Sequence, residues 1–352
     1  MYSESDIDGA VEAGAITRDA ATALRDHIAR SQSAPAVDEE HFRLLTGFND
    51  IFVSIAAAAV LVGMAWLGES IWLPLAGTLV AATAWGLAEY FTRKRRMALP
   101  SILLLLAFVG GVAASLVGAM IQFHVDDFSR SVMPDHPDSI NGLFAAGIAA
   151  VAAGAAWLHW QRFMVPITVA AGAVAAAGMV IAPIVAFARD SNQLVYPLVL
   201  VAGVAVFALA MWWDMSDLER QTRRSDVAFW LHLAAAPMIA HSVFHWLGVF
   251  DGRMSAPMAG VVIALYIVFA LVALAVDRRA LLVSSLAYVL YAMYSLFEQA
   301  QTVELSAGLT AVIIGSALLM LSAFWHPMRG AIVNLLGELR HRLPPVQMPV
   351  AA

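Results

Sequence analysis

Ten apolar stretches of about 20 residues divide this chain, and their length constrains the fold more than any other feature. A helix of about 20 apolar residues crosses the roughly 30 Å hydrocarbon core of a bilayer. Charged residues make up only 13% of the sequence, against about 25% in soluble domains, so they cannot cover a surface exposed to water. We therefore expect an all-α, polytopic membrane bundle of about ten transmembrane helices. The predicted spans are 50–68, 71–91, 98–122, 142–160, 163–187, 194–213, 227–250, 256–276, 280–297 and 305–325.

The basic residues predict the orientation of these spans. Lys and Arg accumulate in the loops that stay in the cytoplasm. With ten spans, 17 of the 20 Lys and Arg residues fall on one side, and the other side holds only Arg130, Arg189 and Arg253. The N-terminal stretch lacks a basic region followed by an apolar one, so we expect no cleavable signal peptide. We predict a multi-pass protein of the bacterial cytoplasmic (inner) membrane with both termini in the cytoplasm.

Two short elements flank the predicted transmembrane domain of residues 49–326. Residues 1–48 form a cytoplasmic helical element in which Gly14 ends one helix and Thr17 caps the next. Helices this short cannot build a core alone, so we expect them to dock on a protein partner. Residues 327–352 form a cytoplasmic tail. Its apolar residues recur at helical spacing up to Leu339, which is typical of an amphipathic helix at the membrane surface.

The N-terminal element carries a resemblance to a known family. The segment GAVEAGAITRDAATALRDHI, followed by FNDIFV at the start of the first span, resembles DUF2157. Members of this family are bacterial membrane proteins with a short N-terminal helical domain and many spans. The resemblance covers roughly residues 5–65. It implies a class of membrane protein and supplies no mechanism, because the family has no established activity.

Two histidines occupy the seventh predicted span. His241 and His245 are four residues apart and so project from one face of the helix, while His232 points to roughly the opposite face and is left out of the predicted site. Neutral imidazoles bind zinc, copper and iron well. His124, at the end of the third span, is a candidate third ligand. The pair is interpreted as a metal or haem site, as a proton relay, or as buried histidines that bond to neighbouring helices.

A second polar stripe runs along the ninth predicted span. Its members recur about every 3.5 residues and share one face, and they include Tyr288. We hypothesise that this face meets the histidine face in a polar pocket open to the periplasm. Tyr291, Ser295 and Glu298 are the candidate pocket residues. The alternative is that these hydroxyl groups only hold neighbouring helices together.

The remaining features narrow the function to three classes. The chain has no cysteine, which excludes disulfides and thiolate sites, and its net charge of −6 gives no reason to expect nucleic acid as a partner. The lipid bilayer is the one partner that composition requires. No Asp, Glu, Lys or Arg lies near the middle of a span, which argues against an ion-coupled antiporter.

The leading hypothesis is a small-molecule transporter or facilitator, since ten spans can arise from two five-span halves. The first alternative is a membrane scaffold or regulatory protein that acts through its N-terminal helices. The second is a metal- or haem-dependent membrane enzyme built on His241 and His245. Outside that second alternative, no cofactor is expected.

Overall fold

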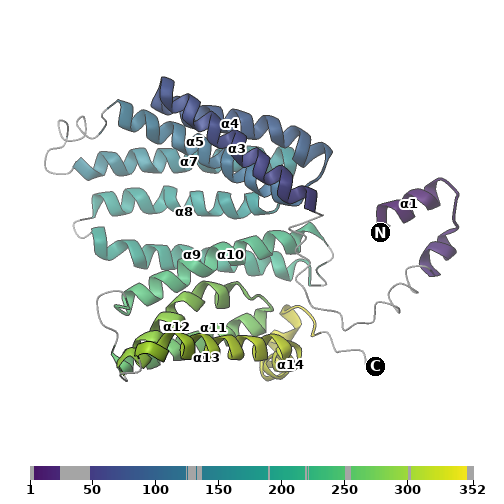
Figure 1. Cartoon of the computed structure of the whole chain (residues 1–352), viewed down its shortest axis with the longest axis vertical. Coiled ribbons are helices and arrows are strands. Elements are labelled where there is room, and N and C mark those ends of the chain that lie inside the picture. The colour runs from purple at the N-terminus through teal and green to yellow at the C-terminus, as the bar shows by residue number, and fades with distance from the viewer. Residues whose placement is uncertain are drawn as a thin grey trace. The chain divides into compact units, whose positions relative to one another are not determined.

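The computed structural model describes residues 4–23, 48–123, 125, 132, 137–188, 191–218, 220, 222–249, 255–299 and 303–346. All regular secondary structure within these ranges is helical (Figure 1), so the prediction of an all-α fold is confirmed. The chain forms two compact units. One consists of Met1–Phe42 with Gln347–Ala352, and the other is Arg43–Val346.

In the first unit, α1 covers Glu4–Glu12 and a turn follows it. Gly14 adopts a φ of +69° in this turn, a conformation that glycine reaches without strain. The Thr17 hydroxyl accepts a hydrogen bond of 3.1 Å from the Ala20 amide. This is the helix cap that the sequence predicts.

In the second unit, each of the ten predicted spans coincides with a helix, and successive helices run back and forth across the unit (Figure 1). The helices are α3 (Phe48–Ile71), α4 (Leu73–Ala88), α5 (Ala98–Gln122), α7 (Pro137–Phe163), α8 (Ile167–Phe187), α9 (Ser191–Met215), α10 (Arg223–Trp246), α11 (Ala256–Val276), α12 (Ala280–Gln299), α13 (Val303–Ala323) and α14 (Trp325–Leu335), with a π-helix at Glu89–Lys94 and a 3₁₀-helix at Gly337–Arg342.

Seven of these helices are long and apolar enough to cross a membrane, namely α3, α5, α7, α8, α9, α10 and α11. The bent pair of α13 and α14 adds an eighth span if it counts as one. The α-helical part of α4 has 16 residues, about 24 Å at 1.5 Å per residue, and the described apolar part of α12 is also short, at Ala280–Tyr294. Multiple membrane spans are therefore confirmed, and the count of ten stays a prediction.

The boundary between the fourth and fifth predicted spans was placed too early. The prediction breaks the chain at residues 161–162, whereas α7 continues to Phe163 and α8 begins at Ile167. Met164 adopts a φ of +54° at the break, and Pro166 directly precedes α8. The left-handed residue and the proline end the helix, because neither continues a regular hydrogen-bond ladder. The polar pair Gln161–Arg162 is part of α7.

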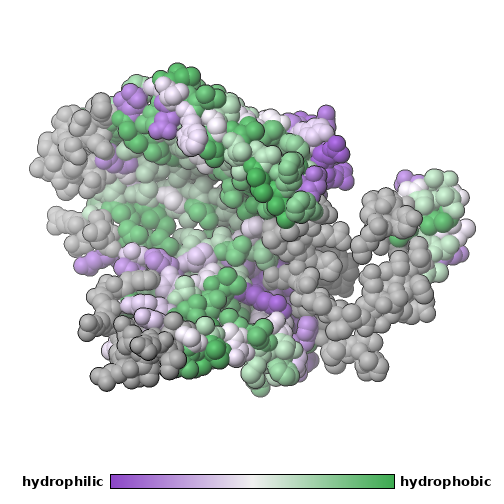
Figure 2. All heavy atoms as spheres, in the orientation of Figure 1, coloured by the Kyte–Doolittle hydropathy of each residue, from purple (hydrophilic) through white to green (hydrophobic). Residues whose placement is uncertain are grey.

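The surface of the second unit is largely apolar, as a lipid-facing surface must be. Apolar residues cover much of the visible surface of the helices in Figure 2. α10 differs from the other helices, because half of the residues in its apolar window are buried, against 6% in α8. It packs against α8, α9 and α12, and Ala236, Ala240 and Phe244 belong to the largest buried apolar cluster. The helix that carries the predicted histidines is thus the central one of its region.

Candidate functional site

The predicted histidine face of α10 meets α12. His241 Nδ1 lies 2.6 Å from the Tyr288 hydroxyl oxygen, a hydrogen-bond distance. One turn further along α10, the His245 ring stacks on Tyr196 of α9, with centroids 3.5 Å apart and ring planes 25° apart. Tyr288 in turn stacks on the fully buried Phe244 at 4.3 Å. We call His241, His245, Tyr196 and Tyr288 the imidazole–phenol cluster.

Helix geometry explains how these four residues come together. The i, i+4 spacing of the two histidines places them on one side of α10. α9 and α12 both pack against α10 and supply one tyrosine each. Imidazole and phenol groups both donate and accept hydrogen bonds. The cluster therefore offers donors, acceptors and aromatic faces on helices whose middle parts carry no Asp, Glu, Lys or Arg.

The other predicted site residues are only partly described. Tyr291 follows Tyr288 by three residues on α12, and its side chain is 40% exposed. The side chains of Ser295 and Glu298, and all of His124, lie outside the described part of the chain. The ring centroids of His241 and His245 are 6.3 Å apart. In the described ranges no group of three or more His, Asp or Glu residues is close enough to hold a metal ion, so the metal site stays a prediction.

A buried group of charges lies at one end of α9–α12, and sequence reasoning missed it. Asp214, at the end of α9, accepts hydrogen bonds from Arg278 at 2.6 and 3.2 Å. His232 lies on the face of α10 opposite to His241, and its Nε2 is 3.0 Å from the same carboxylate. All three side chains are at most 5% exposed. Arg278 also donates to the Ser225 carbonyl oxygen at 3.2 Å.

Asp277 organises the second part of this group. Its carboxylate accepts hydrogen bonds from Arg220 at 2.9 Å and from the Trp325 indole N–H at 2.8 Å. Arg329 of α14 lies 3.4 Å from the same carboxylate. The Arg329 guanidinium also donates to the carbonyl oxygens of the two prolines at 344 and 345. Arg329 therefore links the segment that follows α14 to Asp277 at the end of α11.

We call these residues the charge cluster: Asp214, Arg220, His232, Asp277, Arg278 and Arg329. Arg220 and Asp277 adopt φ values of +55° and +60°, a region that non-glycine residues rarely occupy and that costs of order 1–3 kcal/mol. Their ion pair holds both residues in place. The cluster fixes the ends of α9, α10, α11, α12 and α14 to one another, so it closes this end of the helix group.

Sequence spacing contained little signal for the charge cluster. Asp214 and Arg278 both lie at the ends of apolar stretches, where charges are also explained by topology alone. His232 was set aside because it points away from His241, and it does face elsewhere, toward Asp214. Its pairing joins residues 18 positions apart, and the Asp214–Arg278 pair joins residues 64 apart. The only sequence feature that pointed to the charge cluster was the presence of charged residues at the ends of three neighbouring spans.

The fold and the hydropathy define the class of this protein: it is a multi-pass integral membrane protein. No protein-family model, no curated protein and no solved structure matches the chain. The resemblance to DUF2157 therefore stays a prediction.

Proposed function

We propose that the protein is a small-molecule transporter or facilitator whose solute binds at the imidazole–phenol cluster. The observation that carries this proposal is the 2.6 Å contact between His241 and Tyr288, a polar pair between the apolar helices α10 and α12 in which the His241 side chain is exposed. Polar and ionisable side chains are costly in a bilayer, and they usually mark a substrate or ion pathway. Aromatic stacking of Tyr196 on His245 adds a flat, pre-ordered surface beside the polar groups.

The position of the cluster along α10 favours access from one side. His232, in the charge cluster, is nine residues from His241, which corresponds to about 14 Å of helix. The opposite end of α10, at Trp246, is only five residues from His241, or about 8 Å. The charge cluster closes the end of α10 near His232. A solute would therefore enter from the end of α10 nearer His245, and passage to the other side would require the charge cluster to open.

The chemistry of the cluster indicates the class of solute. Imidazole and phenol groups provide donors and acceptors of hydrogen bonds, and no Asp, Glu, Lys or Arg lies near the middle of α10 or α12. A site without a fixed charge fits a neutral organic solute better than an ion. The lack of a mid-span carboxylate likewise fits a facilitator better than an ion-coupled carrier.

The orientation belongs to the same proposal. The charge cluster lies at the end where the basic loops gather, and the excess of Lys and Arg on that side supports a cytoplasmic location. The imidazole–phenol cluster would then open toward the periplasm of a bacterial inner membrane. Both termini would lie in the cytoplasm.

Uptake into proteoliposomes tests the proposal. Vesicles with the full chain are incubated with a mixture of neutral metabolites, washed, and analysed by mass spectrometry against empty vesicles. We expect at least one solute to equilibrate faster in the protein-containing vesicles. Tyr288→Phe should slow its uptake, while Tyr294→Phe on the same helix should not. Equal uptake by empty and protein-containing vesicles would overturn the proposal.

A further inference from the structure

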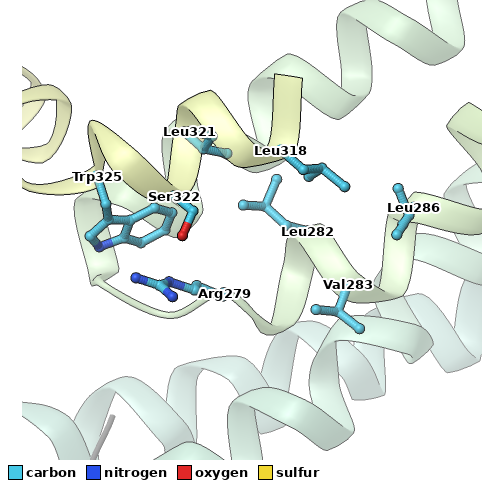
Figure 3. Close-up of a pocket in the computed structure, with 8 residues that line it drawn as sticks. All are labelled: Arg279, Leu282, Val283, Leu286, Leu318, Leu321, Ser322 and Trp325. Atoms are coloured by element: carbon cyan, nitrogen blue, oxygen red, sulfur yellow. The ribbon is translucent and has the colours of Figure 1, made fainter. Parts of the chain in front are cut away.

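An apolar groove lies between α12 and α13, and none of its lining residues belongs to either cluster (Figure 3). Leu282 and Leu286 of α12 form one wall, and Leu318 and Leu321 of α13 form the other. The cavity has a volume of about 140 Å³. From Arg279 to Leu286 it follows α12 over seven residues, which corresponds to about 10 Å. Its dimensions and lining suit a narrow, flexible apolar chain.

One end of the groove is polar and positively charged. Arg279 and Trp325 lie together there, as Figure 3 shows, with the guanidinium carbon 4.7 Å from the centre of the indole ring. The Trp325 N–H donates to Asp277 at 2.8 Å, which fixes the ring. Arg279 directly precedes α12, so it also lies at the positive end of that helix dipole. The mouth of the groove therefore presents a positioned cation.

The charges nearby leave Arg279 unneutralised. Asp214 is paired with Arg278, and Asp277 with Arg220 and Arg329. Within the described part of the chain, Arg279 forms no ion pair. An anion at the mouth of the groove would supply the counter-charge for Arg279.

The surroundings of the groove place it against the bilayer. Val283, which lines it, is 65% exposed, and Leu319 beside the opposite wall is 73% exposed. Apolar side chains with this exposure in a membrane protein face lipid. Trp and Arg residues at the ends of spans are typical of the level of the lipid headgroups. The groove therefore runs from headgroup level into the hydrocarbon region.

We propose that this groove binds one anionic phospholipid, with its phosphate on Arg279 and one acyl chain between α12 and α13. Charge complementarity selects the headgroup, and the leucine walls accept the chain. The Trp325 ring holds the Arg279 guanidinium at the mouth of the groove, between the sites of the headgroup and of the acyl chain. The proposal is independent of solute transport, because none of these residues belongs to the imidazole–phenol cluster.

Native mass spectrometry of the full chain in detergent tests the proposal. Dioleoyl phosphatidylglycerol and dioleoyl phosphatidylcholine are titrated separately, so that only the headgroup differs. We expect the first complex to be the tighter one for the wild type. Arg279→Gln should weaken phosphatidylglycerol binding about fivefold, the effect of one basic residue near anionic lipid, and should weaken phosphatidylcholine binding less, because the choline cation already offsets the phosphate charge of that lipid. Arg279→Lys should retain most of the preference.

Two further variants separate this site from general effects. Arg95→Gln removes an exposed arginine that follows the π-helix at Glu89–Lys94 and does not line the groove. This variant should leave lipid binding unchanged. Leu318→Trp fills the groove without changing the charge and should weaken binding of both lipids. Equal affinity of the wild type for the two lipids would overturn the proposal. So would an equal loss in Arg279→Gln and Arg95→Gln, or unchanged binding in Leu318→Trp.

Discussion

The first half of the helix group, α3–α8, and the second half, α9–α14, are held together by different kinds of contact. In the first half, α4 and α5 approach so closely that a Cβ on Gly111 would lie 2.8 Å from the Ala81 backbone nitrogen. Its main ion pair, Glu89 with Arg162 at 2.7 Å, is partly exposed. In the second half, Asp214 and Arg278 are paired in the interior. Small residues hold the first half together, whereas buried charges fasten the second.

A buried histidine in the first half sharpens this contrast. His159 is 0% exposed, and the rings of Trp85, Phe108 and Phe163 surround it. Its polar contact is the Thr168 hydroxyl, at 3.4 Å. His232 in the second half instead meets a carboxylate at 3.0 Å. Buried ion pairs add little net stability, so the buried pairs described in the second half are better explained by a role beyond stability, which supports the proposal of a solute site there.

The largest expected effect follows from breaking the charge cluster. Asp214→Asn leaves Arg278 buried without its carboxylate, and removing one partner of a buried pair costs about 3–5 kcal/mol. We expect a large fall in the thermal unfolding midpoint of the detergent-solubilised protein. Glu89→Gln is the matched variant in the exposed pair and should stay close to the wild type. A similar fall in both variants would remove the distinction between the halves.

A substitution in the small-residue interface of the first half should have an intermediate effect. The backbones of Ser115 and Gly111 leave no room for a side chain at Gly77, so Gly77→Val forces α4 and α5 apart. Overpacking of this kind costs about 1–3 kcal/mol. Gly86→Val, on the same helix, meets open space. The thermal unfolding midpoint should fall clearly for Gly77→Val and little for Gly86→Val. Equal falls would mean that the helix propensity of valine, and not overpacking, lowers the stability.

The smallest effect on stability should come from the imidazole–phenol cluster. Tyr288→Phe removes the hydroxyl that contacts His241, and such hydrogen bonds between membrane helices contribute about 0.6 kcal/mol on average. The unfolding midpoint should therefore hardly change, while solute uptake falls. Tyr294→Phe changes a partly exposed phenol on the same helix and should affect neither quantity. A large loss of stability in Tyr288→Phe with normal uptake would make the contact structural.

Helix positions could be predicted from the sequence, and most contacts between helices could not. The predicted spans 98–122 and 256–276 match α5 and α11 residue for residue, because proline and charged residues bound these apolar runs. The 72° bend between α13 and α14 falls at the predicted border between the last span, 305–325, and the C-terminal tail, where His326, Pro327 and Arg329 interrupt the apolar run. Spacing revealed the shared face of His241 and His245. It also placed Tyr288 on the stripe that was hypothesised to meet the histidine face, and the structure brings Tyr288 to His241. It contained no information on Tyr196, because that contact depends on how α9 packs against α10.

Accessibility of single cysteines is the most direct test of a solute site in the second half. The chain has no cysteine of its own, so Tyr288→Cys, Tyr291→Cys and Val268→Cys each carry one thiol. Val268 lies on the exposed apolar surface of α11 and serves as the lipid-facing control. A membrane-impermeant maleimide added to the periplasmic side should label the two former tyrosine positions and leave position 268 unlabelled. If positions 288 and 291 react as slowly as position 268, water does not reach the imidazole–phenol cluster from the periplasm and the proposed solute site does not exist.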